Sequence, residues 1–282
     1  MQLRQALTAA VDHLESSDVG SPRPNAETLL MFVLGVNRAY LYAHPERELS
    51  SEEQARYDEV IAQRSKDVPS QYITGHQEFW GLDFLVSPAV LIPRPETEHL
   101  VEAVLELARD VPNARIVDVG TGSGCIALAL AHELRSADIF AVDLSVEALE
   151  IAQANAARLQ LDKRVRFLQS NVLEALADRR DFDFVVSNPP YVGYNEADKV
   201  QRSVFKYEPR LAVFAGDNGL VVIRPLIEQA HAVLKTCGYL AMEIGYSMRD
   251  AVLSLLSPNL WDEPQVVPDL QGIPRVIAAR KR

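Results

Sequence analysis

The sequence predicts an α/β protein in which a mostly parallel sheet carries helices on both faces and is preceded by a small helical domain. From about residue 97, β-branched runs alternate with helical segments, which is the pattern of βαβ units in a parallel sheet. Before residue 75, apolar residues instead recur at the spacing of one helix face. The chain has 282 residues, 48% of them hydrophobic, enough for one large and one small domain.

Three helices are expected in the N-terminal part. The first presents an apolar face made of Leu3, Ala6, Leu7, Ala10, Val11 and Leu14. The stretch GSPRPN at 20–25 is expected to separate it from a second helix over 26–34. Ser50 and Glu53 have the spacing of a capping box for a third helix that reaches about Arg64.

A β-hairpin is expected between the two domains. The stretch EFWGLDFLVSPAVLIPRPETE alternates aromatic and aliphatic residues across Gly81 and Pro88, which favours two short strands. Pro93 and Pro95 then stiffen the chain. We expect the helical domain to cover residues 1–75, the hairpin linker 76–96 and the α/β domain 97–282.

The α/β domain begins with strand and helix patterns in turn. Strands are expected at 114–120, 137–143, 164–170, 182–187 and 238–244, and helices at 124–134 and 146–159, the second capped by Ser145. The last stretch, PQVVPDLQGIPRVIAARKR, is typical of two strands joined by a turn. An antiparallel strand is therefore expected at the end of the sheet.

Composition excludes several classes of protein. No apolar run approaches the roughly 18 residues of a membrane helix, and the N-terminal stretch has no signal-peptide pattern, so a cytoplasmic location is expected. The net charge of −11, and seven Lys or Arg against twelve Asp or Glu in residues 1–80, argue against non-specific binding of nucleic acid. Cys125 and Cys237 are expected to be small buried hydrophobes, and no metal site is predicted because no His or Cys pair has ligand spacing.

A glycine-rich loop indicates a nucleoside-type cofactor. In VDVGTGSGC, glycines stand at 120, 122 and 124 between a predicted strand and a predicted helix, and Asp143 ends the next strand, where its carboxylate suits ribose hydroxyls. A nicotinamide dinucleotide and S-adenosylmethionine are both open. The dinucleotide fingerprint is G-x-G-x-x-G, which presents a helix N-terminus to pyrophosphate, whereas here the third glycine comes one residue early. The spacing favours the methyl donor, and Cys125, which follows the loop, is expected to pack rather than react.

The stretch SNPPYVG at 187–193 carries the strongest chemical signal. It ends the predicted strand FDFVVS beside the glycine loop. An sp² nitrogen, as in an amide or adenine, is a poor nucleophile because its lone pair is delocalised. The Asn188 oxygen and the carbonyl that follows can accept its two N–H bonds, Pro189 and Pro190 hold that carbonyl rigidly, and Tyr191 can stack on the planar acceptor. The pattern predicts a methyltransferase acceptor clamp.

Beyond these motifs, longer phrases show a family resemblance. The sequence resembles, over nearly its whole length, the HemK/PrmC family of release factor glutamine methyltransferases. The matching stretches are QYITGHQEFWGLDFLVSPAVLIPRPETE, VDVGTGSGCIALALA, FAVDLSVEALEIAQANA, VVSNPPYV and EPRLAVFAGDNGL. Many methyltransferases share the glycine loop and NPPY, whereas LIPRPETE and EPRLAVFAGDNGL together are far more specific.

The resemblance implies a Rossmann-like class I S-adenosylmethionine-dependent methyltransferase sheet and a helical domain that helps to dock the substrate. It implies that a methyl group of S-adenosyl-L-methionine, which becomes S-adenosyl-L-homocysteine, passes to the side-chain amide nitrogen (N5) of the GGQ glutamine in peptide chain release factors. The implied cofactor contacts are Gly120, Thr121, Gly122, Ser123, Gly124, Asp143, Asn171, Val172 and Asn188. The implied catalytic and substrate contacts are Asn188, Pro189, Pro190 and Tyr191.

One stretch departs from the family pattern. The family commonly has an acidic residue near the adenine, whereas this chain has Asn171 and Val172. Because Asn still accepts and donates hydrogen bonds, we expect the site to persist even if its affinity changes. Arg94 and Glu98 border the pocket or pair on the surface, and the sequence leaves both open.

Three rival functions stay open at this stage. A nucleic-acid adenine-N6 methyltransferase would also use NPPY, although no basic segment interleaved with aromatics is visible. A ribosomal-protein glutamine methyltransferase would use the same chemistry on another docking surface. A binding protein without turnover is disfavoured because NPPY is intact. The preferred release factor and the oligomeric state do not follow from the sequence.

Overall fold

The computed structural model describes all 282 residues, which form two compact units. One unit contains Met1–His76 together with Gln201–Tyr207, and the other contains Gln77–Val200 together with Glu208–Arg282. None of the helices combines the length and the apolar composition that crossing a membrane requires. The two units are called the helical unit and the catalytic unit below.

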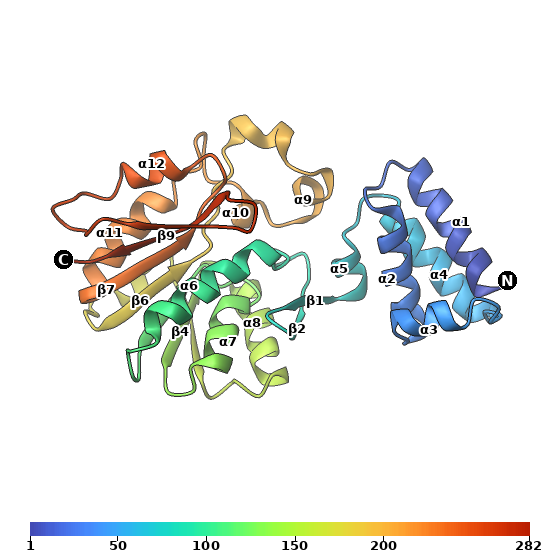
Figure 1. Cartoon of the computed structure of the whole chain (residues 1–282), viewed down its shortest axis with the longest axis horizontal. Coiled ribbons are helices and arrows are strands. Elements are labelled where there is room, and N and C mark those ends of the chain that lie inside the picture. Colours follow the sequence, from blue (N-terminus) through green and yellow to red (C-terminus); the bar gives the residue numbers. More distant parts are fainter. The chain divides into compact units, whose positions relative to one another are not determined.

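The helical unit consists of short helices, and those from the N-terminal part of the chain surround one apolar core (Figure 1). They are α1 (Leu3–Ser16), α2 (Pro22–Leu34), α3 (Arg38–Ala43), α4 (Ser51–Arg64), α5 (Ser70–Thr74) and α9 (Arg202–Tyr207). Leu14, Leu29 and Leu30 are fully enclosed, and the Tyr57 hydroxyl donates to the Ala26 carbonyl at 3.0 Å. From α9, the Lys206 Nζ and the Tyr207 hydroxyl donate to the Lys66 carbonyl at 2.9 and 2.8 Å.

Two helix starts in this unit show how local chemistry sets a boundary. The predicted capping box is confirmed, because Glu53 N donates to Ser50 Oγ at 3.1 Å and Ser50 N donates to Glu53 Oε2 at 2.9 Å. The second helix begins at Pro22, however, and not after GSPRPN. Proline is favourable in the first turn because its missing N–H has no helical partner there.

The predicted hairpin is present in the catalytic unit. Its strands are β1 (His76–Phe79) and β2 (Leu82–Leu85), and Trp80 and Gly81 form the turn with φ of 55° and 69°. Positive φ at both central residues is the two-residue turn that matches the twist of the strands. Trp80 N donates to Glu98 Oε1 at 2.8 Å, which ties the turn to the following helix.

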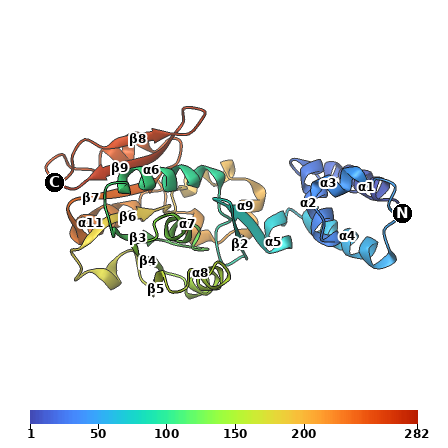
Figure 2. The ribbon, with the colours of Figure 1, turned by 60° about the horizontal axis from the view of Figure 1, so that its bottom comes forward.

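A seven-stranded sheet forms the middle of the catalytic unit, and the predicted α/β fold class is confirmed. Its strands are β3 (Arg115–Val119), β4 (Asp138–Asp143), β5 (Val165–Gln169), β6 (Phe182–Ser187), β7 (Leu234–Glu243), β8 (Gln265–Pro268) and β9 (Pro274–Arg280). Across the sheet their order is β5-β4-β3-β6-β7-β9-β8, which Figure 2 shows from bottom to top. β3 to β7 run parallel, and β9 lies antiparallel between β7 and β8.

Helices cover both faces of this sheet, so strands such as β3 are buried on both sides. One face carries α6 (Glu98–Ala108), α7 (Cys125–Glu133) and α8 (Val146–Arg158), and the other carries α11 (Ile223–Val233) and α12 (Arg249–Leu253). The shorter elements are η1 (Pro95–Thr97), η2 (Glu174–Leu176), η3 (Tyr194–Lys199) and α10 (Arg210–Val213).

One cysteine expectation is wrong. Cys125 is buried, but Cys237 is exposed and has a φ of 66°. It lies where β7 starts earlier than expected, next to the register shift between Phe182 and Phe184 of β6. The irregular backbone turns this side chain away from the core.

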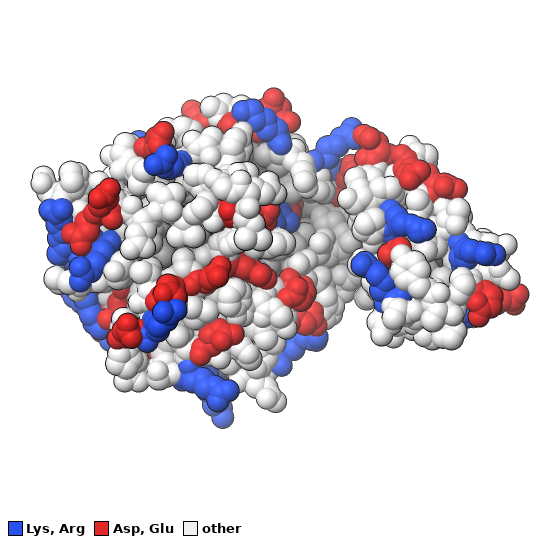
Figure 3. All heavy atoms as spheres, in the orientation of Figure 1, with Lys and Arg blue, Asp and Glu red and all other residues white.

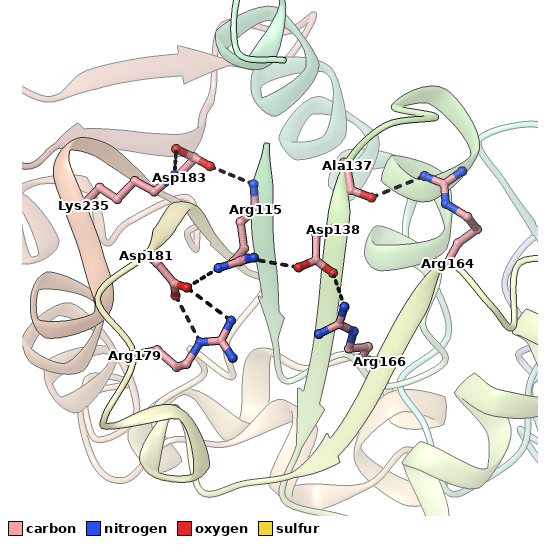
Figure 4. Close-up of polar contacts among 9 residues, drawn as sticks. All are labelled: Arg115, Ala137, Asp138, Arg164, Arg166, Arg179, Asp181, Asp183 and Lys235. Atoms are coloured by element: carbon pink, nitrogen blue, oxygen red, sulfur yellow. Dashed lines mark hydrogen bonds and ion pairs between the residues drawn. The ribbon is translucent and has the colours of Figure 1, made fainter. Parts of the chain in front are cut away.

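The amino ends of the parallel strands are joined by ion pairs (Figure 4). Arg115 of β3 donates to Asp138 of β4 at 3.0 Å and pairs with Asp181, and its backbone N donates to Asp183 at 2.8 Å. Asp183 also accepts from Lys235 at 2.8 Å. The charged network therefore lies at the amino ends of the strands. The cavity described next lies at their carboxyl ends.

Candidate active site

A cavity of about 910 Å³ lies at the carboxyl ends of β3, β4, β5 and β6. Ligands of open parallel sheets bind at this edge because helix N-termini and loops converge there. Part of its polar lining comes from the predicted site residues, and its apolar lining includes Leu91, Ile126, Leu211, Phe214 and Val221. Ten predicted residues line it: Gly120, Thr121, Gly122, Ser123, Asp143, Asn171, Val172, Asn188, Pro189 and Pro190.

The glycine loop follows β3 and is held by backbone bonds. Gly120 N and Thr121 N donate to the Val142 carbonyl at 2.9 and 3.0 Å. Gly120 and Gly122 have φ of 71° and 55°, a conformation that glycine adopts without a Cβ penalty. The loop can therefore present backbone rather than side chains to a ligand.

Asp143 lies beside this loop at the end of β4. Its Oδ2 accepts from Gly122 N at 2.8 Å and its Oδ1 from Ser145 N at 2.9 Å. Burial raises the pKa of Asp143, while these backbone donors oppose the shift. Each carboxylate oxygen has a second lone pair, so the group is fixed in place and still able to accept from two hydroxyls.

Gly124 has a packing role rather than a lining one. A Cβ added there would lie 3.2 Å from the Ala152 Cβ of α8 and 3.1 Å from Leu128 Cδ1, and its φ is 82°. It is not among the residues that line the cavity. The third glycine thus allows α8 to lie against the loop.

Asn155 of α8 is a positioning residue that the sequence analysis did not identify. Its Nδ2 donates to the carbonyls of Leu85 and Ser123 at 3.0 and 2.9 Å, and its Oδ1 accepts from Leu85 N at 2.6 Å. It is completely buried. A fully bonded buried amide joins the hairpin to the glycine loop, and only the tertiary structure reveals it.

Two buried polar atoms near the loop have no partner. Ser123 Oγ lines the cavity, and Asp118 Oδ1 lies beneath the loop at the end of β3. The other Asp118 oxygen accepts from Thr121 Oγ1 at 2.6 Å and from Ala127 N at 3.2 Å. Burial raises the pKa of Asp118 to about 7. Unpaired buried groups are costly, so Ser123 Oγ in the cavity wall fits a ligand that brings polar atoms, whereas Asp118 does not line the cavity. In the sequence, Asp118 could have been noticed as an acidic residue that stands just before the glycine loop.

Asn171 and Val172 follow β5 and line the same cavity. Asn171 Nδ2 donates to Glu174 Oε1 at 2.8 Å. The Oδ1 atom of Asn171 therefore points away from the Glu174 carboxylate. Val172 has a φ of 52°, which is strained for a β-branched residue. Such strain is concentrated at ligand-binding sites, where the surrounding structure holds it.

The NPPY segment ends β6. Ser187 Oγ donates to the Val119 carbonyl at 2.7 Å, which anchors the end of the strand to β3. Asn188 Nδ2 donates to Thr97 Oγ1 at 3.0 Å. Tyr191 is not among the lining residues, because its ring packs against the core and its hydroxyl donates to Glu243 Oε1 at 3.3 Å.

The segment 213–220 explains why the FAGDNGL phrase accompanies NPPY. Val192 N donates to the Val213 carbonyl at 3.1 Å, and Ala215 N donates to the Val192 carbonyl at 2.9 Å. A Cβ on Gly219 would overlap the Tyr191 carbonyl. Glycine is required there because two backbone segments touch.

The structure resolves the open roles of Arg94, Glu98 and Cys125. Arg94 lines the cavity and pairs with Glu208, whose Oε2 also accepts from Ile92 N at 3.2 Å. Glu98 instead binds the hairpin turn. Burial raises the pKa of the Cys125 thiol to about 12, which favours packing over reaction as a thiolate.

Comparisons with known proteins agree with this arrangement. Residues 5–75 match the model of the PrmC N-terminal domain, and residues 96–212 match that of the methyltransferase small domain. Among solved structures, the hMettl16 catalytic domain superimposes with a TM-score of 0.59 at 19% identity, covering 75% of this chain and 80% of that one. A T. thermophilus 16S rRNA methyltransferase, RsmC, in complex with AdoMet and guanosine gives a TM-score of 0.53 at 21% identity, with 73% and 50% covered. At these identities the solved structures establish the fold alone.

Curated relatives match over the full length. A release factor glutamine methyltransferase of Koribacter versatilis is 57% identical over 281 residues, covering 100% of this chain and 99% of the relative. The protein of the same name from Moorella thermoacetica is 43% identical, again over 100% and 99%. At this identity and coverage, the chain belongs to the release factor glutamine methyltransferase family.

Proposed function

We propose that this protein transfers a methyl group from S-adenosylmethionine to the side-chain amide nitrogen of the GGQ glutamine in peptide chain release factors. The observation that carries the proposal is that Asn188, Pro189 and Pro190 line the same cavity as the glycine loop and Asp143. The relatives' names support the substrate class. The helical unit is proposed to help dock the release factor, because residues 5–75 match the PrmC N-terminal domain.

The cavity fits S-adenosylmethionine, which supplies an electrophilic methyl group when bound. Asp143 is proposed to accept from the ribose hydroxyls, and Asn171 and Val172 to border the adenine. The backbone of Gly120 and Gly122 and the unpaired Ser123 Oγ suit the polar remainder of the ligand. A cavity of about 910 Å³ leaves room for part of an acceptor as well.

Asn188 is proposed to orient the acceptor amide. Its Nδ2 donates to Thr97, and this bond orients the amide so that Oδ1, its acceptor atom, can accept one N–H of the acceptor while the Pro189 carbonyl accepts the other. This aims the nitrogen lone pair at the methyl group. Orientation of reacting groups supplies about 7–11 kcal/mol of barrier reduction, which suits a weak nucleophile that loses its proton readily once methylated.

The apolar rim is proposed to exclude water. Leu211 is 75% exposed and Val221 is 61% exposed, although both line the cavity. Such exposure is costly unless a substrate covers it. In this structure the Tyr191 hydroxyl bonds to Glu243, so stacking of Tyr191 on the acceptor stays a proposal. The aromatic rings that line the cavity are those of Tyr194 and Phe214.

The test is transfer of labelled methyl to a purified release factor, beside its GGQ Gln→Ala variant and an adenine-containing DNA. We expect label on the intact factor alone. Label on DNA would show that the protein is an adenine methyltransferase. Figure 3 does not favour that outcome, because acidic and basic side chains are interspersed on the visible face of the catalytic unit. Label on none of the three would contradict the release-factor proposal and make a ribosomal protein the next acceptor to test.

A further inference from the structure

We propose, on the basis of the proposed function, that Glu243 is a positioning residue that fixes the direction of the Asn188 amide through the Thr97 hydroxyl. Glu243 lies outside the quoted family stretches and Thr97 lies within LIPRPETE, but neither was assigned a role from the sequence. Both are buried, with exposed fractions of 2% each. Glu243 ends strand β7 and Thr97 lines the cavity, so both belong to elements distant from NPPY in sequence.

Sheet register brings the three residues together. Ser187 of β6 pairs with Met242 of β7, so the residues that follow, Asn188 and Glu243, emerge side by side at the carboxyl ends. Thr97 ends η1, directly before α6. Thr97 Oγ1 donates to Glu243 Oε2 at 2.6 Å and accepts from Asn188 Nδ2 at 3.0 Å.

The carboxylate sets the polarity of this chain of hydrogen bonds. An ionised carboxylate only accepts, so the single hydroxyl proton of Thr97 must point at Glu243. The Thr97 oxygen then offers only lone pairs to Asn188, which must approach with Nδ2. Asn188 Oδ1 is consequently held on the other side, where the acceptor amide needs an acceptor of N–H bonds.

Loss of the charge permits the opposite polarity. A protonated Glu243, or a glutamine in its place, can donate to Thr97 Oγ1, and the hydroxyl proton can then turn to Asn188 Oδ1. That arrangement rotates the amide and presents Nδ2 to the acceptor. Two donors then face each other, so the acceptor loses its orientation while the fold is kept.

Titration of Glu243 is set by several neighbours. Burial raises its pKa to about 7, the hydrogen bonds from Thr97 and Tyr191 and the charge of Arg275 lower it, and Glu96 raises it. Cys125 is also close enough for its own pKa to be raised by Glu243. Because the pKa of Glu243 is raised, Glu243 is mainly a carboxylate only above a pH of about 7. Transfer should therefore increase with pH through about 7.

Stability should respond to pH with the opposite sign. A group whose pKa is higher in the folded state binds its proton more tightly there. Its contribution to stability is fully present below the unfolded value of 4.5 and is lost as pH rises through about 7. If activity only followed the stability of the fold, activity would fall as the pH rises. Measuring both activity and stability against pH therefore separates an effect on orientation from an effect on folding.

The experiment compares Glu243→Gln and Thr97→Val with the wild-type protein on a release factor. We expect kcat to fall about 10²-fold in both variants, as misplacement of reacting groups does, with the dissociation constant of S-adenosylmethionine unchanged. The pH-dependent limb near 7 should disappear in Glu243→Gln. Thr97→Ser keeps the hydroxyl and should recover most of the rate. Glu98→Gln is the matched control, because Glu98 binds the hairpin turn and not the cavity.

Each outcome bears on one claim. Wild-type protein that methylates no glutamine would overturn the proposed function and this inference with it. Active wild-type protein with an equally active Glu243→Gln variant, or an unchanged pH limb, would overturn the inference alone. If Glu243→Gln fails to fold, the ratio of Thr97→Ser to Thr97→Val decides, and equal rates for these two would also overturn it.

Discussion

The Asn188 amide and the Asp143 carboxylate are each held by bonds that leave a particular atom for a ligand. Thr97 occupies Asn188 Nδ2, and two backbone N–H groups hold the Asp143 oxygens. Preorganised polar groups cost no rearrangement when the substrate binds. The two residues are therefore expected to fail in different ways when they are replaced.

Asn188→Ala should abolish transfer and leave cofactor binding largely intact. The substitution removes the oxygen that orients the acceptor, which we expect to lower kcat by about 10²-fold or more. Calorimetry with S-adenosylmethionine beside a methyl-transfer assay measures both quantities. Activity that survives the substitution would contradict the acceptor-clamp argument.

Asp143→Ala should act on the cofactor first. Loss of hydrogen bonds to a charged acceptor, at about 1.5–3 kcal/mol, predicts a dissociation constant raised about 10- to 100-fold. Asp138→Ala is the matched control, because Asp138 begins the same strand at the opposite edge of the sheet. Equal dissociation constants for the wild-type protein and Asp143→Ala would exclude the ribose role.

At the scale of elements, helix α8 and the glycine loop are packed directly on each other. Ala152 lies against Gly124, and Asn155 bonds to the Ser123 carbonyl and to strand β2. One helix thus holds the loop and the hairpin together. The loop is positioned by close packing as well as by its own glycines.

Gly124→Ala tests this packing. Its φ of 82° disfavours alanine, and the added Cβ would lie 3.2 Å from Ala152. Strain and overpacking should lower the free energy of unfolding by about 1–3 kcal/mol and weaken cofactor binding, although residue 124 does not line the cavity. Chemical denaturation and calorimetry measure the two effects. If the alanine variant were as stable as the wild-type protein, α8 could shift to accommodate the added Cβ without lowering the free energy of unfolding, which would contradict this prediction.

At the scale of the whole molecule, the two units have separate apolar cores. The core of the helical unit is built from residues 3–61, and those of the catalytic unit begin at Phe79. Both tryptophans, Trp80 and Trp261, belong to the catalytic unit. Tryptophan fluorescence therefore reports on one unit, whereas far-ultraviolet circular dichroism reports on the helices of both.

We expect the two signals to give different unfolding transitions. S-adenosylmethionine at one hundred times its dissociation constant should stabilise the catalytic unit by about 2.7 kcal/mol and shift the fluorescence transition. The part of the dichroism change that belongs to the helical unit should not move. Coincident transitions that shift together would show that the chain unfolds as one cooperative unit.

Local chemistry explains which parts of the fold were predictable. The strands at 115–119 and 182–187 and the capping box of Ser50 and Glu53 were correct, because their signals lie within a few neighbouring residues. The start of α2 at Pro22 and the exposed Cys237 were wrong. A proline fits either a loop or a first turn, and a bulge in β7 depends on the register of β6.

The sequence by itself determined the α/β class, the glycine loop, the NPPY segment and the family resemblance, because each is written in residues close together along the chain. Only the tertiary structure decided that Gly124 packs against α8, that Arg94 borders the cavity, and that Tyr191 and Thr97 meet Glu243. These contacts join residues up to 146 positions apart. They follow from strand register and helix packing, which no local pattern specifies.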